Sequence, residues 1–194
     1  MAQGEDQVYR LNGCWYVPCH AVRLAAGPFL SASPNWVKQH VELPPDFLLD
    51  RYLGGVRMDR AGLAAALVHG DSMIYRDVYD GDIAIFQRYE FDYLQNGKLV
   101  VIEKLGEEEG FGAWALKRLV IERPRSSHRN EYEDEIDWDD PVIVLHSYNP
   151  HVSPRRLDPS GRYRVHGILR RSLRRHDATF VDSDMIRRLV TGEE

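Results

Sequence analysis

Short runs of alternating apolar and polar residues recur along the chain and predict strands more often than helices. In the run 113–121, this period of two places Ala115, Lys117, Leu119 and Ile121 on one face of a strand and Arg118 on the other. Turn dipeptides such as Asn-Gly and Asp-Gly separate the runs. We predict short strands within Leu11–Pro18, with a turn at Asn12-Gly13, and at Ala21–Leu24, and further strands at Ile83–Phe86, Lys98–Glu103 and Ala113–Ile121.

Helical signals are few and short. Pro44-Pro45-Asp46 offers a helix start, and Asp182–Val190 has the spacing of a short amphipathic helix. The pattern therefore predicts a mainly β fold with short helical segments.

The stretch Leu67–Phe86 organises the candidate chemistry. It begins as an apolar strand, turns at Gly70-Asp71, presents Ser72, turns again at Asp80-Gly81 and resumes as a strand. A serine on a tight turn between two strands is accessible, as a nucleophile must be, but it needs a base to activate it.

Lys117 is the candidate base. Its predicted strand face is apolar, and burial disfavours the charged ammonium, so a neutral lysine could take the proton of a serine hydroxyl. Serine-lysine pairs are known variants of the serine-hydrolase arrangement. His69 lies closer to Ser72 in sequence, but strand alternation does not direct it reliably toward the serine.

Three motifs occur in a characteristic order: Gly70-Asp71-Ser72-Met73, then Asp80-Gly81-Asp82, then Lys117-Arg118-Leu119. This order resembles the catalytic core of the LexA/UmuD-type self-cleaving peptidases, which are related to signal peptidases. The resemblance covers roughly residues 15–172. Pro141–Pro150 resembles the family's strand and the asparagine-containing turn after it, and Tyr163–Arg170 resembles its closing strand. It implies a β-rich fold like that of the LexA carboxy-terminal domain, with Ser72 as nucleophile and Lys117 as base. The backbone N–H groups of Ser72 and Asp71 would stabilise the oxyanion.

The resemblance also implies a cleavage site. Family members cut themselves at an Ala-Gly or Cys-Gly bond that follows a strand, and Ala26-Gly27 matches that position. Small side chains on both sides let the bond approach the serine closely. Pro28 departs from the pattern, because it restricts the backbone and removes an N–H on the leaving side, which would slow cleavage or prevent it.

We expect three parts in the chain: an amino-terminal arm with the cleavage site (1–27), a peptidase domain (28–175) and a carboxy-terminal tail (176–194). Since only about 25 residues precede the bond, with no room for a helix-turn-helix domain, we expect a UmuD-like architecture and no direct DNA binding.

Composition favours a cytoplasmic protein. Of the 194 residues, 43% are hydrophobic and 28% are charged, and no apolar run approaches the roughly 18 to 20 residues of a membrane helix. The amino terminus lacks a signal-peptide pattern. We expect Cys14 and Cys19 to be reduced thiols, and we expect neither a metal nor a cofactor.

Charge is unevenly distributed. The segment 126–140, which we interpret as an insertion, holds seven acidic residues and one arginine, a formal charge of −6. Residues 151–194 hold ten arginines and six acids, a formal charge of +4. The insertion could be a solvated loop, or either segment could dock a protein partner.

The resemblance implies a self-cleaving regulatory switch of the DNA-damage (SOS) type. The resemblance implies a homodimer and activation by a RecA–single-stranded-DNA filament. Two alternatives stay open: a protease that cuts a separate protein in trans, and a non-catalytic dimeric interaction module with the same fold.

Overall fold

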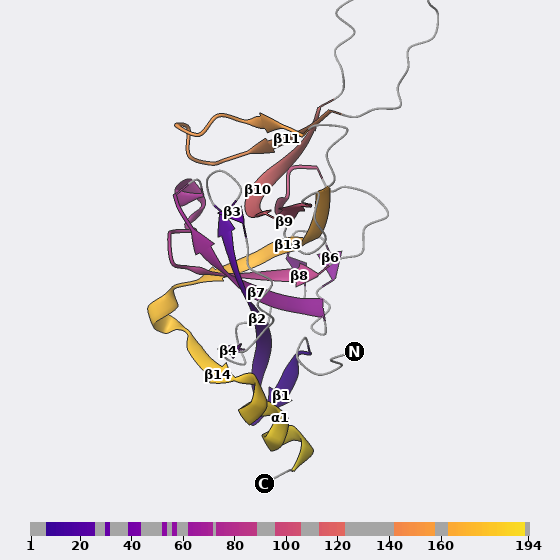
Figure 1. The fold of residues 1–194 in the computed structure, drawn as a ribbon, viewed down its shortest axis with the longest axis vertical. Helices are drawn as coiled ribbons and strands as arrows, with labels where there is room; N and C mark the ends of the chain where they lie inside the picture. Colours follow the sequence, from indigo (N-terminus) through magenta and orange to yellow (C-terminus); the bar gives the residue numbers. More distant parts are fainter. Residues whose placement is uncertain are drawn as a thin grey trace, which may run out of the picture.

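The computed structural model describes residues 7–25, 30–31, 39–43, 52–53, 56–57, 62–71, 73–88, 96–105, 113–122, 142–157 and 163–192. These residues form a mainly β fold with short helical segments, which confirms the predicted class (Figure 1). The strands are β1 (Tyr9–Leu11), β2 (Cys14–Ala25), β3 (Leu30–Ser31), β4 (Gln39–Leu43), β5 (Tyr52–Leu53), β6 (Val56–Arg57), β7 (Leu63–His69), β8 (Ile83–Arg88), β9 (Leu99–Lys104), β10 (Ala113–Glu122), β11 (Val142–His146), β12 (Arg155–Arg156), β13 (Tyr163–Leu173) and β14 (Thr179–Asp182). The helix α1 spans Ser183–Thr191, and 3₁₀ turns span Ile74–Arg76 and Arg175–Asp177.

One large sheet contains most strands, in the order β12-β11-β10-β9-β13-β8-β7-β2-β4-β14. This sheet also closes on itself, because the end of β2 pairs in parallel with β10 as well as with β7. The strands β2, β7, β8, β13, β9 and β10 therefore form a closed ring of six strands, which we call the ring.

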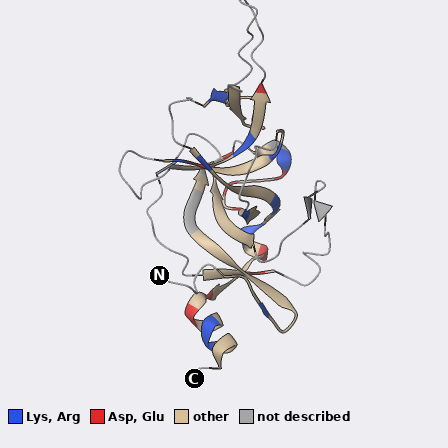
Figure 2. Ribbon diagram, turned by 90° about the vertical axis from the view of Figure 1, so that its right-hand side faces the viewer, with Lys and Arg blue, Asp and Glu red and all other residues tan. Residues whose placement is uncertain are grey.

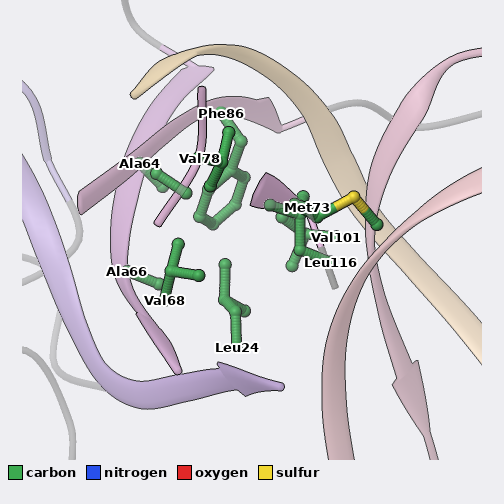
Figure 3. Close-up of a cluster of buried hydrophobic side chains, with 10 residues drawn as sticks. Leu24, Ala64, Ala66, Val68, Met73, Val78, Phe86, Val101 and Leu116 are labelled. Atoms are coloured by element: carbon green, nitrogen blue, oxygen red, sulfur yellow. The ribbon is translucent and has the colours of Figure 1, made fainter. Parts of the chain in front are cut away.

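The interior of the ring is the main hydrophobic core. Figure 3 shows buried side chains converging on it, with Leu24 from β2, Val68 from β7 and Phe86 from β8. Val101 from β9 and Leu116 from β10 complete the lining opposite. Alternate residues of each ring strand thus point inward, as the period of two predicted.

Close approach of two ring strands requires the glycine at 167. A methyl group on Gly167 of β13 would overlap the main chain of Gln87 in β8. The β13 pairings shift register on either side of this contact, next to Val165 and Leu169. Gly167 therefore lets β13 bend across the ring.

The amino-terminal strand differs from the prediction. Instead of two short strands, β2 runs continuously from Cys14 to Ala25, with an irregularity between His20 and Arg23. Pro18 does not interrupt it, although proline is uncommon within a sheet. The predicted turn at Asn12-Gly13 is confirmed, since both residues have positive φ, as a type I′ hairpin requires.

Two further predictions concern residues outside the described part of the chain. They are the helix start at Pro44–Asp46 and the acidic segment 126–140. Among the helices of the described part, none is long and apolar enough to span a membrane.

Candidate functional site

Lys117 lies in the middle of β10 and is only 6% exposed. Ala115, Leu119 and Ile121 pack in one hydrophobic cluster, whereas Leu116 packs in the ring interior, so the two faces of β10 alternate as predicted. Burial lowers the pKa of the Lys117 ammonium from 10.5 to about 8. About a tenth of the molecules would then hold a neutral amine at pH 7, against about 3 in 10,000 for an ordinary lysine.

A serine that sequence reasoning missed contacts this lysine. Nζ of Lys117 donates a hydrogen bond to Oγ of Ser147 at 3.0 Å. Ser147 directly follows β11, and His146 at the end of β11 pairs with Arg118 of β10. The antiparallel register therefore brings Ser147 to the level of Lys117.

Ser72 itself lies outside the described residues, but the structure anchors the chain on both sides of it. The Gly70 N–H donates to Oδ1 of Asp80 at 2.7 Å, and the same oxygen lies 3.0 Å from Nδ1 of His69. After the serine, Met73 is fully buried in the ring interior. The chain is thus held at Gly70, before Ser72, by the Asp80 carboxylate, and at Met73, after Ser72, by packing in the core.

The Asp80-Gly81-Asp82 motif serves this turn. Asp80 accepts the Gly70 N–H, and Gly81, with φ of +81°, forms the bend and donates its N–H to the Val68 carbonyl. The buried Asp82 carboxylate accepts the Tyr79 N–H at 2.9 Å and pairs with Arg174 at 3.0 Å. Each of the three motif residues therefore makes a hydrogen bond or ion pair that holds the chain around the turn.

Asp71 links the turn electrostatically to the lysine. The Asp71 carboxylate favours the charged form of Lys117 and partly offsets the effect of burial on its pKa. Asp71 and Ser72 are the two predicted oxyanion donors. The structure describes Asp71, at the turn after β7, and Ser72 lies outside the described residues.

The predicted cleavage bond, Ala26-Gly27, also lies outside the described residues, but both flanks are placed. Ala25, at the end of β2, pairs with His69 of β7 and with Ala115 of β10. The chain returns as β3, where Leu30 pairs with Trp114. The residues around the bond therefore leave and rejoin the sheet beside β10, two to three positions from Lys117.

His69 lies at the end of β7, directly before the turn. Its ring contacts Asp80 and is about half exposed, whereas Lys117 is buried and bonded to Ser147. In the described part of the chain, no group of three or more His, Cys, Asp or Glu side chains could hold a metal ion.

The described arrangement thus combines a buried lysine of lowered pKa, a hydroxyl that accepts its hydrogen bond, and a turn whose Asp71 carboxylate acts on that pKa. The last residue of β2 pairs with the strand before the turn and with the strand of the lysine. No family model and no curated protein matches the chain.

Proposed function

We propose that the chain is a serine peptidase that cuts its own Ala26-Gly27 bond, with Ser72 as the nucleophile and Lys117 as the base. One observation carries the proposal: Ala25 pairs both with the strand that leads into Ser72 and with the strand that holds Lys117. In the proposed mechanism the peptide bond that follows Ala25 would lie near both catalytic groups, and proximity of this kind accelerates reactions strongly.

The reaction would proceed through an acyl-enzyme. Neutral Lys117 takes the proton of the Ser72 hydroxyl while its oxygen attacks the Ala26 carbonyl carbon, and backbone N–H groups of Ser72 and Asp71 bind the oxyanion. The lysine ammonium then gives its proton to the Gly27 nitrogen as the C–N bond breaks. Water, deprotonated by Lys117, hydrolyses the ester.

Ser147 supports the base role. A neutral amine can donate a hydrogen bond to Ser147 and keep its lone pair for another proton, so the 3.0 Å hydrogen bond would orient the amine without blocking its action on Ser72. Ser147 is therefore a positioning residue in this mechanism.

The biological setting rests on the sequence resemblance. We propose a cytoplasmic UmuD-like switch of the DNA-damage response, stimulated when a RecA–single-stranded-DNA filament favours the cleavable conformation. The lowered lysine pKa supports slow basal turnover at neutral pH, since most molecules still carry the ammonium.

Intact-mass spectrometry after incubation between about pH 6 and pH 10 tests the proposal. We expect a fragment that begins at Gly27 in the wild type, forming faster as pH rises, and none in Ser72→Ala or Lys117→Ala. Lys104→Ala is the matched control, because Lys104 is an exposed lysine at the end of β9.

Pro28→Ala adds a second arm, in which restored backbone freedom should speed cleavage. Full-length protein under all conditions, with Pro28→Ala and added RecA filament included, would refute self-cleavage at this bond.

A further inference from the structure

The residues directly after β11 contact both halves of the candidate site. Ser147 accepts the hydrogen bond of Lys117. The next residue, Tyr148, has its ring under the guanidinium of Arg76, which lies 4.6 Å from the ring centroid. Arg76 ends the 3₁₀ turn that follows Ser72, within residues 70–77, which we call the serine turn. One short segment of the chain thus reaches both the lysine and the serine turn.

Tyr148 also contacts the strand of the lysine and the core. The guanidinium of Arg118, which directly follows Lys117 in β10, lies 5.8 Å from the centroid of the same ring. Both distances fall within the roughly 6 Å over which a guanidinium is attracted to an aromatic face. The partly buried Tyr148 side chain also packs against the core cluster that contains Met73. The tyrosine therefore joins the serine turn, the ring interior and β10.

Both partners of this contact are held in place. After β11, the side-chain oxygen of the buried Asn149 accepts the His151 N–H at 3.0 Å, and its carbonyl accepts the Val152 N–H at 3.0 Å. In the serine turn, the Arg76 N–H donates to the Met73 carbonyl at 2.8 Å. The contact between ring and guanidinium thus links two ordered pieces of the chain.

We propose that Tyr148 is a positioning residue: its contact with Arg76 holds the serine turn in place relative to Lys117. This role rests on the proposed function, in which Ser72 and Lys117 are the reacting groups. A misplacement of about 1 Å can slow an enzyme reaction about a hundredfold, so groups on separate strands need such a link. Ser147 orients the amine, and Tyr148 sets the position of the turn that presents the hydroxyl.

Hydrogen–deuterium exchange of the full-length Ser72→Ala protein tests the contact without cleavage. The N–H groups of Ile74 and Arg76 bond within the serine turn, so their exchange reports how often it opens. Tyr148→Leu should speed exchange in peptides covering residues 70–78 about fivefold, and leave β14 unchanged. Tyr148→Phe keeps the ring and should restore most of the protection. Unchanged exchange in the leucine variant overturns the proposal, whether or not the wild type cuts itself.

Self-cleavage measures the consequence for the reaction. Tyr148→Leu should lower the rate constant about tenfold, with an unchanged pH midpoint, because this substitution alters no charge near Lys117. Arg76→Gln should lower it about three- to fivefold, and the double variant should be no slower than Tyr148→Leu, since both remove one contact. Losses that multiply in the double variant contradict a shared contact. A wild type that does not cut itself refutes the proposed function, and the exchange result then decides the role of Tyr148.

Basic residues occur along the long axis of the molecule (Figure 2), and one of them provides a matched control. The Arg10 guanidinium lies 5.5 Å from the Trp15 ring centroid, at the opposite end of β2 from Ala25. Arg10→Gln removes a contact of the same kind and should change neither the exchange of residues 70–78 nor cleavage. A loss equal to that of Arg76→Gln would assign the effect to overall charge and overturn the proposal.

Discussion

The ammonium group of Lys117 lies among apolar side chains on its face of β10, where water solvates it poorly. The same burial that prepares a base opposes folding, since the unfolded chain holds the proton with a pKa near 10.5 and the folded chain with a pKa of about 8. The penalty is fully present below pH 8 and disappears as pH rises toward 10.5.

Lys117→Met should therefore stabilise the protein at neutral pH. Replacing a buried charge with an apolar side chain of similar length is expected to raise the free energy of unfolding by about 1 to 3 kcal/mol at pH 7. Urea unfolding measures this value, and the difference from wild type should shrink by pH 10.5. Lys104→Met, at an exposed position, should show neither effect.

Asp71→Asn should shift the pH profile of cleavage. The Asp71 carboxylate holds the pKa of Lys117 higher than burial alone would set it, so removing the charge lowers that pKa. More neutral amine is then present at pH 7, and the midpoint of the rate profile moves to lower pH. Asparagine keeps the backbone N–H, so an unchanged midpoint would show that Asp71 and Lys117 do not interact.

Ser147→Ala should slow cleavage by roughly tenfold or more, because Lys117 loses the acceptor that orients it. Ser147→Thr retains a hydroxyl and should restore most of the rate. Single-turnover rates across pH, with thermal unfolding as a folding control, separate a positioning role from a merely structural one. Equal losses in both variants, with lowered stability, would assign Ser147 to packing.

The sequence predicted Lys117 as a site residue and did not predict Ser147, for a physical reason. The burial of Lys117 follows from local alternation within one strand. The contact with Ser147 depends on the register between β10 and β11, and the 19 residues between these strands contain the acidic segment. No local pattern fixes a register across such a connection.

At the scale of elements, apolar runs located the strands well but could not order them. The predicted helix at Asp182–Val190 is present as α1, because its cap and spacing are local signals. The parallel pairing of β2 with both β7 and β10 joins residues distant in sequence, and only tertiary packing determines it.

Gly167→Ala tests the closest approach between two elements of the ring. The added methyl group would overlap the main chain of Gln87, which cannot yield as a flexible side chain would. We therefore expect the free energy of unfolding to fall by about 3 kcal/mol. Gly13→Ala is the comparison, since nothing lies within 4 Å of a methyl group there. Its cost comes from positive φ alone and should be near 1 kcal/mol in the same urea titration.

At the scale of the whole molecule, β2 closes the ring, because it pairs with β7 on one side and with β10 on the other. It pairs with β1, β4, β7 and β10, and its Val17 and Leu24 side chains are fully buried in two different clusters. The residues expected to form an amino-terminal arm thus include a central strand.

The fragment 1–26 should therefore stay bound after cleavage at Ala26-Gly27. Native mass spectrometry of the cut protein should show both pieces together, and denaturant should separate them. A chain that begins at Gly27 should fail to fold when expressed alone, because β4 and β7 lose the strand between them. A folded chain without β2, or prompt loss of the fragment from native protein, would contradict this expectation.

After cleavage at Ala26-Gly27, the stability of the folded protein depends on protein concentration. An intact molecule keeps β2 beside β7 at any concentration, whereas in the cut molecule a strand that departs must find its partner again through solution. Each opening would then expose the ring interior to proteases for longer than before. Self-cleavage in this fold would thus shorten the lifetime of the whole protein, because the first cut makes later degradation faster.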